Sequence, residues 1–209
     1  MAIVFESWKN IPDDHWCFHV EKQYRVAILN VQNNVDVCVF ISPSDCRGAR
    51  LILKIYYENK SDAKESYNRF ASVYEITSIA NAAAIMSKYY MDYDICPQIF
   101  FAGNNAMSLD NEDLILGKKE PFLPHAHLVG RHGPNKLYAK DKLALRSPSV
   151  GREFNLIGDD SIFDPKDTPL NSKKVPWSSN ELEIFRNDLL DWFKSQDFSP
   201  LNAKWREWN

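Results

Sequence analysis

Residues 123–129 place two histidines two positions apart within an apolar run, a pattern that strongly constrains the fold. On a β-strand, residues two apart share a face, so His125 and His127 point one way while Ala126 and Leu128 point the other. Two imidazoles about 6–7 Å apart along a strand can bind a metal, bind a phosphate, or divide nucleophilic and acid catalysis. A polar strand face with solvated rings is the alternative that spacing alone leaves open.

The rest of the chain supplies partners for this strand. Runs rich in β-branched and aromatic residues predict four more strands, at residues 24–29, 35–41, 49–57 and 97–102. Apolar residues at three- and four-residue steps predict a long helix between the third and fourth of these strands, with Ser61 as its N-cap and an end near Met91. The sequence therefore predicts an α+β domain, with an antiparallel sheet of about five strands and one long helix packed on it.

The chain divides into three predicted parts. Residues 1–23 form an aromatic-rich N-terminal flap, residues 24–146 form the α+β domain, and residues 147–209 form a C-terminal extension that is irregular up to about residue 176. Ser178 and Glu181 form a capping box for a final amphipathic helix. Its stripe is typical of core packing on the domain, with a homodimer or partner surface as the alternative; it consists of Leu182, Phe185, Leu189, Trp192 and Phe193.

Composition narrows the classes of partner. A net charge of −3 predicts no specific binding to nucleic acid and no attraction to an anionic membrane. No apolar run approaches the roughly 20 residues that span a bilayer, and the first residues do not resemble a secretory signal. The cysteines, with no Cys-x-x-Cys pair, indicate reduced thiols and a cytoplasmic protein; they are Cys17, Cys38, Cys46 and Cys96.

The run around the histidines resembles a known family motif. Residues 123–131 read Leu-Pro-His-Ala-His-Leu-Val-Gly-Arg. This run is similar to the His-φ-His-φ-His-φ-φ strand, with φ apolar, of the histidine-triad (HIT) superfamily of nucleotide hydrolases and transferases. In this register His125 is the middle histidine, His127 is the third, and Leu123 occupies the first position. Pro124 matches the His-Pro-His form of the galactose-1-phosphate uridylyltransferase branch, and the resemblance covers roughly residues 25–132.

The resemblance implies a function for each histidine. His125 would attack the α-phosphorus of a nucleotide or nucleotide conjugate, because neutral imidazole is nucleophilic near pH 7. His127 would bind a phosphoryl oxygen or protonate the leaving group. The ligand is then a nucleotide or another phosphorylated small molecule, and the mechanism requires neither a cofactor nor a metal.

The resemblance also implies phosphate-binding residues. Asn104 or Asn105 stands where the family has an asparagine for the α-phosphate, although Asn-Asn after glycine is also an ordinary turn. Lys118 and Lys119 stand in a segment that replaces a shorter Gly-Gln-Ser loop. Arg131 opens a locally basic stretch that would attract an anionic ligand, with a solvated basic loop as the alternative.

Two other function classes remain open. The family usually has an aspartate for the ribose just before the Ile41-Ser42-Pro43 turn, where this chain has Val39 and Phe40, so the nucleoside is left open. A catalytically degenerate HIT-like protein that binds a ligand or another protein is one alternative. A metal enzyme that uses His-x-His is the other, but it needs further ligands, and no histidine follows His132.

Overall fold

The structure is a computed structural model in which seven segments are described. They are residues 19–32, 35–43, 49–67, 71–93, 97–102, 124–130 and 177–209. Within them no helix is both long and apolar enough to cross a bilayer.

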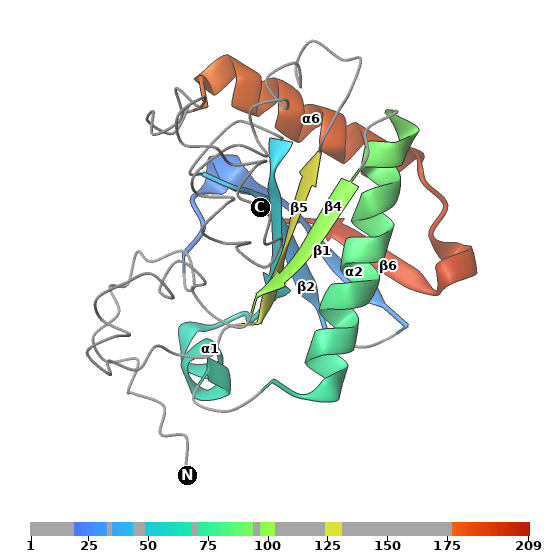
Figure 1. Cartoon of the computed structure of the whole chain (residues 1–209). Helices are drawn as coiled ribbons and strands as arrows, with labels where there is room; N and C mark the ends of the chain where they lie inside the picture. The colour runs from blue at the N-terminus through green and yellow to red at the C-terminus, as the bar shows by residue number, and fades with distance from the viewer. Residues whose placement is uncertain are drawn as a thin grey trace, which may run out of the picture.

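One antiparallel sheet organises the described segments (Figure 1). Its strand order is β4-β5-β3-β2-β1-β6, and each neighbouring pair runs antiparallel. The strands are β1 (Arg25–Val31), β2 (Val37–Ile41), β3 (Leu51–Ile55), β4 (Pro97–Ala102), β5 (His125–Gly130) and β6 (Ala203–Glu207). The predicted α+β class with an antiparallel sheet is confirmed. The sixth strand, β6, comes from the C-terminal end, where the sequence predicted only a helix.

The long helical region consists of two helices, not one. Helix α1 (Lys60–Tyr67) is preceded by Asn59, whose Oδ1 accepts the backbone N–H of Asp62 at 2.9 Å, so the predicted cap at Ser61 is wrong. Helix α2 (Val73–Asp92) starts at its own capping box. There the Ser72 hydroxyl accepts the N–H of Glu75, and the Glu75 carboxylate accepts the N–H of Ser72.

Helix α2 covers one face of the sheet and forms the main core with it. Ala126 and Leu128 of β5 lie in this core, together with Ile79, Ala83 and Met86 of α2. Figure 1 shows α2 lying along the sheet with α6 (Ser179–Ser195) beside its C-terminal end. The predicted capping box of α6 is present, and all five residues of its predicted stripe are buried, so the stripe is core packing.

The C-terminal segment returns to the sheet after α6. A short 3₁₀ turn, η7 (Ser199–Leu201), leads into β6, which pairs with β1. The Trp205 ring packs on Phe193 of α6 with centroids 4.9 Å apart. On the face away from α2, Trp208 packs edge-on against Phe40 and Tyr56. This second face carries a smaller buried cluster, which consists of Val20, Ile28, Cys38, Phe40 and Ile52.

Candidate functional site

Strand β5 carries both histidines on the face opposite α2. Backbone pairing with β3 sets His127 beside Ile52 and His125 beside Lys54. Ile52 belongs to the smaller cluster away from α2. Because directly paired residues share a face, and residues two apart on a strand also share one, both imidazoles project toward that second face.

The two imidazoles contact each other and are buried. Their Nε2 atoms lie 3.0 Å apart, and the rings meet edge to face with centroids 4.8 Å apart. His125 is 3% exposed and His127 is 5% exposed. The alternative of a solvated polar strand face is therefore wrong for these residues, because both side chains are almost wholly buried.

Burial decides the protonation state of His127. The pKa of His127 lies well below 6.5, chiefly because burial disfavours the charged ring, and also because of His125 and the nearby Arg50 guanidinium. His127 is therefore a neutral imidazole at pH 7. A neutral ring presents one N–H donor and one nitrogen lone pair.

Two buried, positively charged side chains lie on the same face of the sheet as the histidines, in the neighbouring strand β3 and just before it. Arg50 immediately precedes β3, Lys54 lies within β3, and their exposed fractions are 5% and 6%. The Arg50 guanidinium donates to the Ser42 hydroxyl from Nε at 3.1 Å and from Nη2 at 2.9 Å. Sequence reasoning missed both cations. The signal was present as the alternation Arg-Leu-Ile-Leu-Lys, which places residues 50, 52 and 54 on one face.

The smaller cluster that includes Ile52, the partner of His127, is apolar. Phe40 is fully buried in the smaller cluster, and Val39 is buried in the main core on the α2 side. Cys38 belongs to the same cluster as Phe40, and its thiol donates to the Lys54 carbonyl oxygen at 3.4 Å. Burial raises the pKa of Cys38 to about 11, so its thiol is protonated at neutral pH and unsuited to act as a nucleophile.

Comparison with known proteins decides the family. A family model described as HIT-like, HIT-related, matches residues 23–188. The chain belongs to the HIT-like family. The crystal structure of an uncharacterised protein, LPG0439, is similar over 95% of this chain and 94% of that chain, with 26% identity and a TM-score of 0.64. No curated protein matches the chain.

In this HIT-like protein the structure brings together only part of the predicted site. His125 and His127 lie in contact, and Arg50 and Lys54 join them from the β3 side. The remaining predicted residues lie outside the described segments; they are Asn104, Asn105, Lys118, Lys119 and Arg131. Among the described residues, no group of three or more histidine, cysteine, aspartate or glutamate side chains could hold a metal.

Proposed function

We propose that this HIT-like protein is a nucleotide phosphohydrolase or nucleotidyltransferase in which His125 attacks the α-phosphate of a nucleotide or nucleotide conjugate. The observation that carries the proposal is the pair of buried imidazoles with Nε2 atoms 3.0 Å apart, beside Arg50. Family membership supports the same ligand class, a nucleotide or another phosphorylated small molecule.

The short contact between the rings allows one histidine to act as the nucleophile and the other as a hydrogen-bond donor. If Nε2 of His125 carries the lone pair, Nε2–H of His127 donates to it, because a contact between two neutral rings needs one donor and one acceptor. A phosphoryl oxygen then takes over the His127 donor and frees the His125 lone pair for attack. Because His127 is neutral, it binds that oxygen as an N–H donor and not as a cation.

The reaction then proceeds in two displacements. A bond forms between His125 Nε2 and the α-phosphorus while the bond from phosphorus to the leaving oxygen breaks. The leaving group takes a proton from the solvent, to which the acceptor of the second displacement returns one. Water or another acceptor next attacks the phosphorus and breaks the bond to nitrogen. Positive charge from Arg50 and Lys54 would stabilise the charge on the phosphoryl oxygens during both steps.

A catalytically degenerate binding protein is the second candidate. Leu123 stands where the family has its first histidine, and Val39 and Phe40 stand where it has the ribose aspartate. Both of the latter side chains are buried in apolar clusters and offer no group to a sugar hydroxyl. A protein of this kind would bind the phosphate without turning the ligand over.

The test uses the full chain and a nitrophenyl ester of a nucleoside 5′-monophosphate. Release of nitrophenolate and a nucleotidyl adduct on His125, detected by peptide mass spectrometry, are the expected results. His125→Gln should lower turnover about 100-fold or more. The matched control is His19→Gln at an exposed histidine outside the site, which should keep full turnover.

Two outcomes would decide against catalysis. Binding of AMP by calorimetry with no turnover would favour the degenerate binding protein. Absence of both binding and turnover in a protein that shows cooperative thermal unfolding would overturn the whole proposal. A folded protein that does not bind nucleotides cannot catalyse this reaction.

A further inference from the structure

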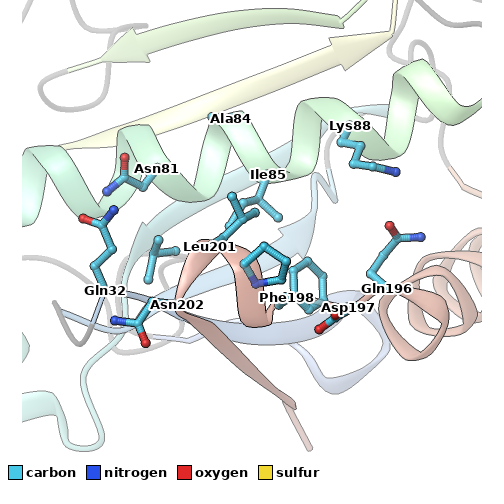
Figure 2. A pocket seen from close by; sticks show the side chains of 12 residues that line it. Gln32, Asn81, Ala84, Ile85, Lys88, Gln196, Asp197, Phe198, Leu201 and Asn202 are labelled. Carbon is cyan, nitrogen blue, oxygen red and sulfur yellow. The ribbon is translucent and has the colours of Figure 1, made fainter.

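A separate hollow of about 630 Å³ lies on the α2 side of the sheet, away from the histidines (Figure 2). Its walls are α2, the turn after β1, and residues 196–202 between α6 and β6. A volume of this size is typical of sites that hold a small molecule or a few residues of a peptide.

The middle of the hollow is apolar. Ile85 of α2 and Leu201 of η7 lie there, with Phe198 beside them (Figure 2). Ile85 and Phe198 are buried in the core, whereas Leu201 is 49% exposed. An occupant that covers Leu201 would therefore remove apolar surface from water, which favours binding.

One end of the hollow carries three carboxamides. The side chains of Gln32, Asn81 and Asn202 lie at this end (Figure 2). None of the three side chains forms a hydrogen bond with a residue that the structure describes, so each offers a donor and an acceptor. Their backbones are fixed nearby, since the Gln32 N–H donates to the Asn202 carbonyl oxygen at 2.8 Å.

The backbone geometry at this end is strained. Gln32 has a φ of 58° and Asn202 a φ of 47°, both in the left-handed region. Glutamine adopts this region at a cost of about 1 kcal/mol or more, whereas asparagine, here the C-cap of η7, adopts it readily. Strain of this kind often lies at ligand sites, and here the two left-handed conformations place two of the three carboxamides at the mouth of the hollow.

The opposite end carries the charges of Lys88 and Asp197. Lys88 forms an ion pair with Asp92, with Nζ and Oδ2 2.5 Å apart. Asp197 accepts the backbone N–H of Ser199 at 2.9 Å. Among the described residues, the other polar groups that line the hollow are neutral amides. The Asp197 carboxylate would repel an anionic occupant, and the paired Lys88 offers it little compensation.

We infer that this hollow binds a short peptide segment without negative charge, in an extended conformation. A peptide group has the same donor and acceptor as a carboxamide, so it can pair with Asn81 and Gln32, while one apolar side chain packs on Ile85 and Leu201. The dimensions agree. Asn81 and Lys88 are seven residues apart on α2, about 10 Å along the helix axis, which is the length of about three extended residues.

The experiment titrates the isotope-labelled full chain with N-acetyl-leucinamide, which has two peptide groups, one apolar side chain and no charge. Amide NMR shifts are expected at Ala84, Ile85 and Leu201. N-acetyl-glycinamide lacks the apolar group and should bind about tenfold more weakly. N-acetyl-leucine, which carries a carboxylate, should also bind more weakly, because the one lysine that lines the described part of the hollow is already paired.

The variant that tests the carboxamides is Asn81→Ala, since alanine favours the helix and should leave α2 folded. It should weaken binding of the probe severalfold. The matched control is Gln23→Ala, which removes an exposed carboxamide outside the hollow. Equal binding by Asn81→Ala and the wild type, equal binding of the charged and neutral probes, or shifts confined to the histidine face would each overturn the inference.

Discussion

The Nε2 atoms of His125 and His127 lie 3.0 Å apart on one face of β5. Burial and the positive charge of Arg50 both disfavour protonation of His127. A neutral His127 can donate its Nε2–H to Nε2 of His125. In that arrangement the lone pair of His125 accepts the hydrogen bond of its neighbour, and the attack proposed above requires a phosphoryl oxygen to take over the His127 donor first.

The low pKa of His127 predicts how stability depends on pH. In the unfolded chain a histidine binds a proton below about pH 6.5, whereas folded His127 stays neutral to a lower pH. The unfolded state therefore binds more protons, and the free energy of unfolding should fall as the pH falls below about 6.5, by up to about 1.4 kcal/mol per pH unit. Urea unfolding between about pH 5 and pH 7 measures this slope.

The substitution His127→Gln should flatten that slope, because the titrating group is gone. His19→Gln, at an exposed histidine, should keep the wild-type slope. A wild-type slope in His127→Gln would show that other groups cause the pH dependence.

The hydroxyl of Ser42 holds the buried guanidinium of Arg50 through two hydrogen bonds. Ser42→Ala removes this acceptor and should lower the free energy of unfolding by about 1.5–3 kcal/mol, the usual range for hydrogen bonds to charged groups. Chemical denaturation measures the change. Ser61→Ala, at an exposed serine of α1, is the matched control and should change stability by less than about 0.5 kcal/mol. Equal effects of the two substitutions would contradict the stabilising role of Ser42.

The sequence predicted correctly those helices and strands whose characteristic residues lie close together in the chain. The alternation of histidine and apolar residues from His125 predicts a strand with the histidines on one face and the apolar residues on the other, and β5 has this arrangement. Ser178 and Glu181 mark the start of α6, and its apolar stripe gives the buried side. In each case the residues that determine the structure lie within one or two turns or a few strand positions of one another.

Long-range pairing explains what the sequence did not predict. Strand β6 is short, and its alternation rests on only two apolar residues, Ala203 and Trp205. Its partner, β1, lies near the other end of the chain, so no local signal joins them. The same reason applies to Lys54, which lies beside His125 only through the register of β3 against β5. The start of α2 was missed because Ser61 is also a plausible cap.

The carboxylate of Asp188 joins the two long helices. It lies on α6 and accepts the hydroxyl of Tyr89 at 2.6 Å and the hydroxyl of Tyr93 at 2.8 Å, one on each oxygen. Burial, followed by the interactions with Asp188, raises the pKa of Tyr93 to about 12. This contact therefore affects both stability and the ionisation of a tyrosine.

Replacement of Asp188 by asparagine should weaken the packing of α6 on α2. The asparagine side chain would keep only one oxygen acceptor for the two hydroxyls, so Asp188→Asn should lower the free energy of unfolding by about 1–3 kcal/mol. The pKa of Tyr93 should fall from about 12 but stay above 10.0, because the charge is lost while the burial remains. NMR titration of carbon-labelled tyrosine measures the pKa, and denaturation measures the stability.

Asp191→Asn removes an exposed carboxylate from the same helix and is the matched control. Asp191→Asn should leave stability almost unchanged. It should also lower the pKa of Tyr93 by less than Asp188→Asn does, because Asp191 is the weakest of the causes that raise this pKa. A fall in stability as large as that of Asp188→Asn would show that the charge of α6, and not the contact with the tyrosines, is responsible.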